Sequence, residues 1–173
     1  FAAEVGKLSP SRRVPVLHHA GHVIWDSLAI CEYVNETFLE GRGWPADAGL
    51  RALARSAACE MHSGFAALRT HLPMNCSRRP DDYRWPAEAQ ADIERVQALW
   101  GQLRGQIKGK GPFLCGEFGI VDAMFAPVAI RFRGYGPVLD VDSQAYVEQL
   151  LALPAMQAWI AAGVAEEPRL AKY

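Results

Sequence analysis

The sequence predicts an α+β chain in which a short β-hairpin and one helix precede an all-helical bundle. Two short β-prone runs lie near the N-terminus, at Val14–Leu17 and His22–Trp25. Farther along the chain, apolar residues recur at steps of three and four, which is the period of amphipathic helices. Glycine and proline occur between the two regions, and residues 41–46 are typical of a linker. We therefore expect two domains, residues 1–40 and residues 47–173.

Local signals place the elements of the first domain. The run Val14–Leu17 follows a Ser-Pro turn segment and is predicted as a strand, and His18–Gly21 is predicted as the tight connection to the second strand. Asp26 and Ser27 are residue types that start helices. An apolar face follows them, and we expect this helix to end near Gly41.

The second domain is predicted to contain five helices. The first has a continuous apolar stripe and is stopped by Pro73, while the third carries almost no charge in its first three turns and is expected to be buried on all sides. The five helices are expected at residues 50–72, 86–107, 120–133, 143–153 and 154–165.

Composition excludes several classes of function. The 173 residues carry 18 basic and 19 acidic side chains, so the chain lacks the positive charge that binding to nucleic acid or an anionic membrane requires. No apolar run approaches the roughly 20 residues of a membrane helix, and no signal-peptide pattern opens the chain. The four cysteines show no C-x-x-C spacing and are interpreted as reduced thiols. We expect a cytoplasmic protein without a nucleic-acid or membrane partner.

Three histidines cluster at the predicted hairpin: His18, His19 and His22. They are either exposed turn residues or metal ligands. No carboxylate or cysteine stands at a spacing that would complete a metal site, which favours exposed turn residues, and we expect no metal.

Two local features carry a more specific chemistry. Pro15 opens a strand, can follow a cis peptide bond, and leaves the backbone groups of Val14 turned outward, where they can pair with an extended ligand. Asp26 and Ser27 stand where a strand gives way to a helix. The helix N-terminus and the Ser27 hydroxyl suit a carboxylate, and Asp26 suits an ammonium group, as the two ends of an amino acid require. The alternative is that Asp26 or Ser27 only caps the helix.

These segments resemble a cytosolic glutathione S-transferase. Ser9–Leu17 is similar to the family's "SP-x-x-x-VP-x-L" run, and Val23–Tyr33 is similar to its acidic residue and serine that open a helix continuing "LAI-x-EY". Gly116–Val128 is similar to the "F-S-I-A-D" segment that opens the central helix of the C-terminal domain, and Glu60–Phe65 resembles a bacterial subgroup. The resemblance covers essentially the whole chain. It implies a partial thioredoxin-like N-terminal domain, hairpin plus helix, followed by an all-α bundle.

The resemblance also implies residue roles in glutathione binding. The backbone of Val14 would pair with the cysteinyl part of glutathione, and Asp26 and Ser27 would hold its γ-glutamyl end. Arg13 stands where the family commonly has Lys or Gln and would reach the glycyl carboxylate.

Two departures from the family pattern are visible. The family's fold begins with a strand-helix-strand unit that carries the thiol-activating Ser, Tyr or Cys in its first turn, whereas this sequence enters near the end of the following helix, around Phe1–Lys7. We therefore expect the natural protein to be longer and the activating residue to lie upstream of Phe1. The second departure is Gly119, where the family usually has Ser or Thr as a helix cap. Asp122 is expected to reach back to the backbone N–H groups at the start of that helix.

As a whole, the resemblance implies a homodimeric detoxification enzyme that joins the glutathione thiolate to a small hydrophobic electrophile, with glutathione as co-substrate. The cleft for the electrophile is expected between the domains, with Met61, His62 and Phe65 as candidates for its wall. For Met61 and Phe65 the alternative is the core of the bundle. Two other functions stay open: a non-catalytic interaction or regulatory domain of the same family, and a glutathione-dependent disulfide reductase or isomerase.

Overall fold

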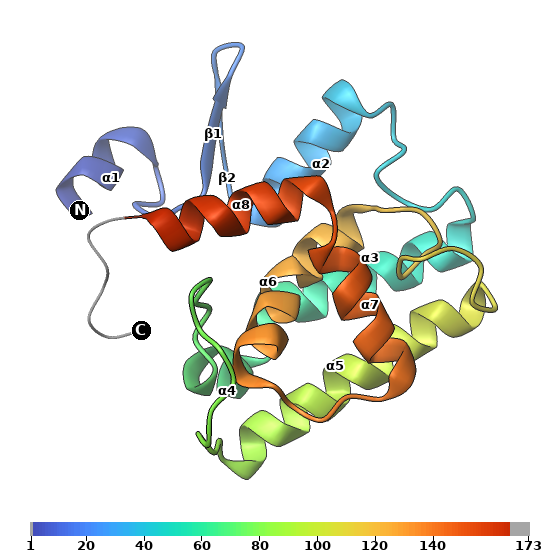
Figure 1. The fold of residues 1–173 in the computed structure, drawn as a ribbon. Helices are drawn as coiled ribbons and strands as arrows, with labels where there is room; N and C mark the ends of the chain where they lie inside the picture. The colour runs from blue at the N-terminus through green and yellow to red at the C-terminus, as the bar shows by residue number, and fades with distance from the viewer. Residues whose placement is uncertain (1, 167–173) are drawn as a thin grey trace. The chain divides into compact units, whose positions relative to one another are not determined.

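The structure is a computed structural model that describes residues 2–166. Phe1 and residues 167–173, which belong to the two predicted domains, lie outside the described residues. The chain divides into two compact units, with the boundary between Trp44 and Pro45 (Figure 1). Within the described range there is one two-stranded sheet, and helices make up most of the rest, which confirms the predicted α+β class.

The N-terminal unit contains a hairpin followed by a helix. Its elements are α1 (Ala2–Leu8), β1 (Val16–His19), β2 (His22–Trp25) and α2 (Ser27–Phe38). The strands are antiparallel, with Val16 paired to Trp25 and His19 paired to His22. The predicted second strand is confirmed, and the first strand begins two residues later than predicted.

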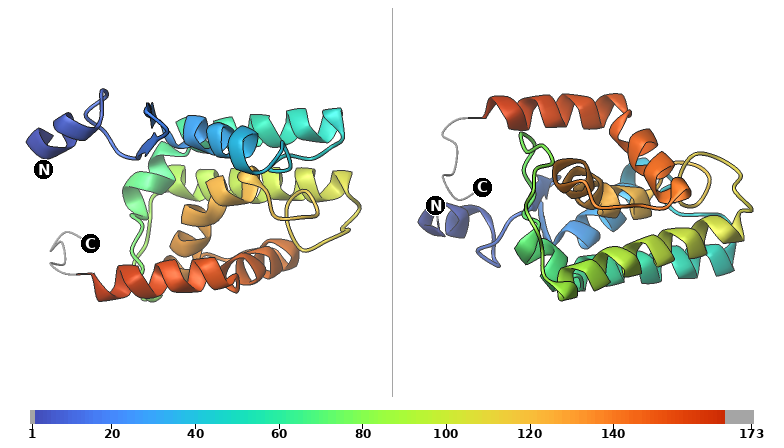
Figure 2. Two further views of the ribbon diagram at one scale, coloured as in Figure 1. Left: turned by 90° about the horizontal axis from the view of Figure 1, so that it is seen from above. Right: turned by 60° about the horizontal axis from the view of Figure 1, so that its bottom comes forward.

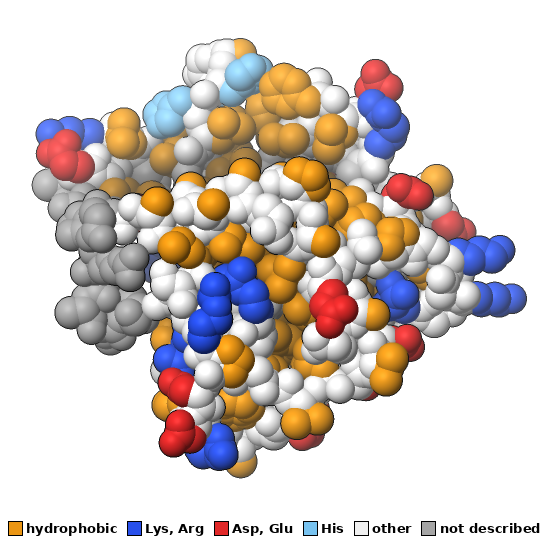
Figure 3. Space-filling view, in the orientation of Figure 1, with side chains coloured by type: hydrophobic (Ala, Val, Ile, Leu, Met, Phe, Trp, Pro, Cys, Tyr) orange, Lys and Arg blue, Asp and Glu red, His pale blue; other side chains and the backbone are white. Residues whose placement is uncertain are grey.

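The turn of the hairpin is shorter than the sequence predicted. His18 and His19 belong to β1, so only Ala20 and Gly21 connect the strands. Both have positive φ, 48° and 79°, as the favoured two-residue hairpin turn requires. Alanine seldom adopts this conformation, and for that reason the turn has no typical sequence signature. The histidines of the hairpin are exposed, and Figure 3 shows pale blue His side chains at the surface of the molecule.

The C-terminal unit is a bundle of helices. They are α3 (Ala48–Ser63), α4 (Ala66–His71), α5 (Ala87–Gln106), α6 (Ile120–Tyr135), α7 (Val141–Leu151) and α8 (Pro154–Ala165). Helix α6 packs against both α3 and α7, which makes it the central helix of the bundle (Figure 2). Ten of its residues are buried, so the predicted burial of this helix is confirmed.

Trp100 of α5 lies at the middle of the bundle core. Its ring meets three others edge to face, with centroids 4.8–5.7 Å apart: Phe125, Phe132 and Tyr146. Each such aromatic pair contributes roughly 0.5–1.5 kcal/mol beyond the burial of its area. The contacts join α5, α6 and α7 into one core.

The single long helix predicted for residues 50–72 is wrong, because the chain breaks between α3 and α4. Gly64 ends α3, and Phe65 adopts the left-handed conformation, with φ 55°. The first turn of α4 is then capped from a distant part of the chain, since the carboxylate of Asp92 accepts the Leu68 N–H at 2.9 Å. The apolar stripe continues across this break, and periodicity alone therefore predicted one helix.

The start of α6 is held by a buried acid, as predicted. Asp122 accepts the backbone N–H of Gly119 at 2.9 Å and that of Leu114 at 3.1 Å. Gly119 has no side chain to complete a reciprocal cap, so Asp122 supplies the only side-chain half of the box.

The helices differ in their potential to span a membrane. No single helix of residues 2–166 is long and apolar enough to cross one, and only α7 and α8 taken together, bent by 75° at their junction, pass by length and composition.

Candidate functional site

The open end of the hairpin brings the predicted glutathione-binding residues close together. The last strand pair is Val16 with Trp25. Continuing this register by two residues brings Val14 to the level of Ser27. The backbone before β1 and the start of α2 therefore lie at the same end of the hairpin, opposite the turn (Figure 1).

Val14 presents an exposed backbone segment. The Val14–Pro15 peptide bond is cis, as predicted. Val14 is 62% exposed, and neither its N–H nor its carbonyl forms a hydrogen bond within residues 2–166. An extended peptide could pair with these two groups in the manner of an added strand.

Asp26 caps α2. Its φ is 77°, and its Oδ1 accepts the N–H of Leu28 at 2.9 Å and that of Ala29 at 3.5 Å. Asp26 therefore does cap the helix. A carboxylate has two oxygens and about four lone-pair sites, so capping is compatible with binding an ammonium group on the exposed side of this residue.

Ser27 is the first residue of α2 and is half-buried. The helix has 12 residues, with no acidic residue in its first turn. The N-terminus of such a helix carries roughly half a positive charge. The position therefore combines an electropositive backbone with a hydroxyl group, which together suit a carboxylate.

Arg13 precedes this site in the chain. Its side chain is exposed and forms no ion pair with any described carboxylate. A guanidinium group on a flexible stem can reach a carboxylate several ångströms from its own backbone.

Sequence reasoning missed the residues that support α2. The side chain of Asn35 is buried and accepts the N–H of Gly43 at 2.7 Å. Glu32 accepts the indole N–H of Trp44 at 2.9 Å. Residues from the predicted linker are thus attached to the helix that carries the site. The sequence did contain a signal for these contacts. Asn35 is a polar residue on an apolar helix face, and a glycine-containing segment follows the helix.

The predicted wall of the electrophile cleft belongs to the other unit. Met61 and Phe65 are buried, which favours the bundle core for both. His62 is half-buried, and its backbone carbonyl accepts a hydrogen bond from the guanidinium of Arg69 at 3.1 Å.

Two cysteines have thiols whose pKa is raised, which makes them poor nucleophiles at neutral pH. Burial, together with the charges of Glu32 and Asp26, raises the pKa of Cys31 on α2. Burial and then the charge of Asp122 raise the pKa of Cys115 to about 12. Since the thiolate is the reactive form, neither group is a candidate for covalent chemistry.

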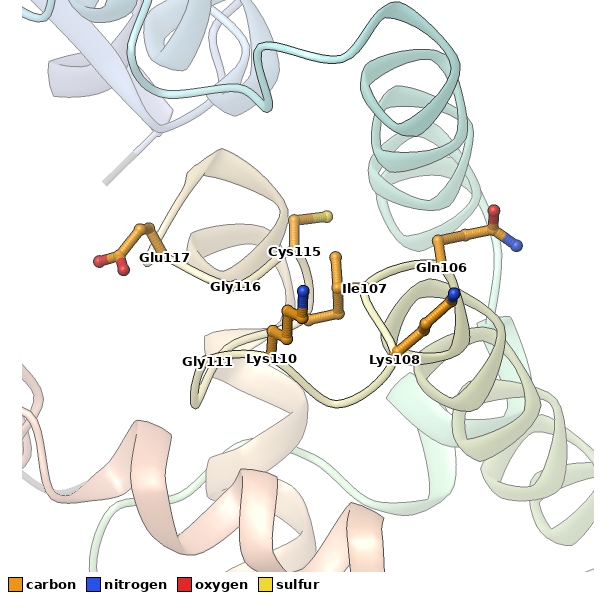
Figure 4. A pocket seen from close by; sticks show the side chains of 8 residues that line it. All are labelled: Gln106, Ile107, Lys108, Lys110, Gly111, Cys115, Gly116 and Glu117. Atoms are coloured by element: carbon orange, nitrogen blue, oxygen red, sulfur yellow. The ribbon is translucent and has the colours of Figure 1, made fainter.

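A pocket of about 510 Å³ at the end of α5 contains none of the predicted binding residues (Figure 4). It is formed by Gln106–Lys108 and by the loop through Lys110 and Cys115 to Glu117. Its only thiol is the unreactive Cys115, so we do not interpret it as the catalytic site.

Two family models match this chain. The model described as the glutathione S-transferase N-terminal domain matches residues 1–37, and that of the glutathione S-transferase C-terminal domain matches residues 86–162. The structure thus has a hairpin-plus-helix part of the thioredoxin-like domain and the helical domain of that family, as predicted.

Several known proteins are similar to this chain. Glutathione S-transferase 1 of Dianthus caryophyllus is 32% identical over 155 residues, which are 82% of this chain and 67% of that protein. Glutathione S-transferase L1 of Arabidopsis thaliana is 25% identical over 154 residues, which are 89% of this chain and 57% of that protein. The chain thus spans a little over half the length of the Arabidopsis relative.

A solved structure has the same fold. It is that of a glutathione transferase homolog from Burkholderia with bound glutathione, 26% identical, with a TM-score of 0.68 over 92% of this chain and 78% of that chain.

Proposed function

Because the chain belongs to the glutathione S-transferase family, we propose that it binds glutathione at the open end of its hairpin and joins the glutathione thiolate to a small hydrophobic electrophile. In this reaction the thiol gives its proton to solvent, a sulfur lone pair forms a bond to the electrophilic carbon, and the leaving group, such as chloride, departs from that carbon with the electron pair of the broken bond. The activity would serve detoxification, in a cytoplasmic homodimer of the bacterial subgroup that the sequence resembles.

The observation that carries the proposal is the match between this end of the hairpin and the groups of glutathione. The γ-glutamyl end has an ammonium group for Asp26 and a carboxylate for Ser27 at the start of α2. The central peptide would pair with the unpaired backbone of Val14. Arg13 would bind the glycyl carboxylate. The glutathione bound in the Burkholderia homolog supports the same ligand here.

Catalysis by such a site is mainly a matter of position. The charged groups at the two ends of glutathione and the backbone pairing at its centre would together fix the position of the sulfur. The electrophile would then meet the sulfur in an oriented complex. For the wall of the electrophile site we propose His62 rather than Met61 or Phe65, because the latter two are buried.

The test is glutathione binding measured by isothermal titration calorimetry. We expect Ser27→Ala to weaken binding by about 1–3 kcal/mol, the range for a hydrogen bond to a charged group. Asp26→Asn is expected to weaken binding by at least as much. Ser56→Ala is the matched control, because its hydroxyl only donates to the Ala52 carbonyl on the exposed face of α3. Equal affinity in all variants would show that Asp26 and Ser27 serve the helix alone.

Activity is then measured on two substrates. Conjugation of glutathione to chlorodinitrobenzene supports the transferase. Reduction of a small disulfide without conjugation would support a glutathione-dependent reductase instead. Failure to bind glutathione at all would support the non-catalytic interaction domain.

A further inference from the structure

A second polar pocket lies wholly within the C-terminal unit, where the end of α4, the loop that follows it and the end of α6 meet. Its volume is about 410 Å³. Its polar and aromatic lining consists of Arg69, Thr70 and His71 of α4, Arg78 and Tyr83 of the loop, and Tyr135 of α6. None of these residues belongs to the site proposed for glutathione.

Cations predominate around this pocket. Arg69 is exposed, and its guanidinium donates to the carbonyl of His62 at 3.1 Å. Arg131, one turn before Tyr135 on α6, donates to the carbonyl of Pro127 at 3.1 Å. Within residues 2–166 neither arginine forms an ion pair with a carboxylate. Figure 3 shows Lys and Arg side chains gathered over the loop between α4 and α5.

The two unpaired arginines repel one another. Burial, and then the charge of Arg69, lower the pKa of Arg131 to about 10. Arg131 is therefore still charged at neutral pH, and its Nε is buried without a hydrogen-bond partner among the described residues. Arg131 does not line the pocket, so an anion bound beside Arg69 would act on it through charge alone, by offsetting the repulsion between the two arginines.

An aromatic wall completes the pocket. The rings of Tyr83 and Tyr135 meet edge to face at 5.8 Å. The Arg78 guanidinium lies 4.1 Å from the centre of the Tyr135 ring, and Asp81 accepts hydrogen bonds from it at 2.9 and 3.0 Å. Asp81 thus neutralises Arg78, and the wall is held in place before any ligand arrives. Tyr83 is 40% exposed, so part of its surface is accessible to a ligand.

We propose that this pocket binds a small organic oxyanion, an aryl carboxylate or aryl phosphate, whose charged head pairs with Arg69 and whose ring packs on Tyr83. The volume has room for on the order of ten water molecules, which is more than a bare inorganic ion requires. The charged head of the ligand pairs with the guanidinium of Arg69, and its ring packs against the exposed surface of Tyr83.

The test is calorimetric titration of the full chain with benzoate, phenyl phosphate and inorganic phosphate. We expect at least one aryl anion to bind and Arg69→Gln to weaken its binding about tenfold or more, as for the loss of a hydrogen bond between charged groups. Lys108→Gln is the matched control, since it removes one exposed positive charge outside this pocket. Weakening by the same factor in both variants, or no binding of any probe, would overturn the proposal.

A second variant tests the aromatic side and does not depend on how Arg69→Gln folds. Tyr83→Leu is expected to weaken the aryl anion several-fold while inorganic phosphate is unaffected. Inorganic phosphate binding as tightly as phenyl phosphate would overturn the organic-ligand assignment. Ser27→Ala should leave aryl-anion binding unchanged, which separates this proposal from the one for glutathione.

Discussion

At the scale of single residues, Asp122 shows how one buried acid can organise a helix start. It accepts the N–H groups of Leu114 and Gly119 and the hydroxyl of Tyr146, the last at 3.0 Å. Burial raises its pKa in spite of these bonds. Three donors from three segments thus depend on a single carboxylate.

Replacing this acid should be costly. We expect Asp122→Ala to lower the free energy of unfolding by about 3 kcal/mol, because buried donors that lose their acceptor cost roughly 1–3 kcal/mol each and part of that is recovered by relaxation. Urea unfolding followed by circular dichroism measures the change. Asp142→Ala, at an exposed position of α7, is the control and should change stability by less than about 0.5 kcal/mol. Similar losses in the two variants would contradict the assigned role.

The cysteines offer a second prediction at this scale. With a pKa of about 12, Cys115 has roughly one thiolate in ten thousand molecules at pH 8. Cys59 is exposed. We expect an aromatic disulfide reagent to label Cys59 rapidly and Cys115 far more slowly, so that Cys59→Ser removes the fastest phase. Rapid labelling of Cys115 in that variant, identified by mass spectrometry, would show that its thiol is not held in the environment described here.

At the scale of elements, the break between α3 and α4 depends on Gly64. A Cβ added to this residue would lie 2.6 Å from the Glu60 carbonyl oxygen, and this oxygen belongs to backbone that cannot move aside. The glycine therefore permits the close approach at which one helix ends and the next begins.

This contact predicts opposite effects for two glycine substitutions. Gly64→Ala should destabilise the protein by about 1–3 kcal/mol, the usual cost of overpacking. Gly101→Ala, on the exposed side of α5 with nothing within 4 Å of its added Cβ, should stabilise it by about 0.5–1 kcal/mol through helix propensity. Thermal unfolding of both variants checks the prediction, and a stabilising Gly64→Ala would indicate that α3 and α4 can form one helix.

The same elements show what could be read from the sequence. The hairpin, α2 and the buried α6 have strong local signals, and the cap from Asp122 follows from its spacing to Gly119. The break after α3 has its cap on Asp92, 24 residues beyond Leu68, and no local pattern reveals such a partner. Asp26 and Ser27 were identifiable because they are adjacent in sequence.

At the scale of the whole molecule, the two proposed sites belong to different units. The residues proposed for glutathione lie between Arg13 and Ser27, in the N-terminal unit. Those proposed for the aryl oxyanion lie between Arg69 and Tyr135, in the C-terminal unit. The second group was not predicted, because no sequence pattern joins an arginine of α4 to a loop and the end of α6.

This separation predicts two distinct patterns of protection from amide hydrogen exchange. A ligand that binds only the folded form stabilises that form by about 2.7 kcal/mol at one hundred times its dissociation constant. Exchange therefore slows in the segments whose local opening would destroy the binding site. Glutathione should therefore slow exchange in residues 14–30, and phenyl phosphate should slow it in residues 69–83. Each ligand serves as the control for the other, and Ser27→Ala should remove only the first pattern. Protection of the loop after α4 by glutathione would show that the tripeptide, and not a separate aryl anion, occupies the pocket of the C-terminal unit.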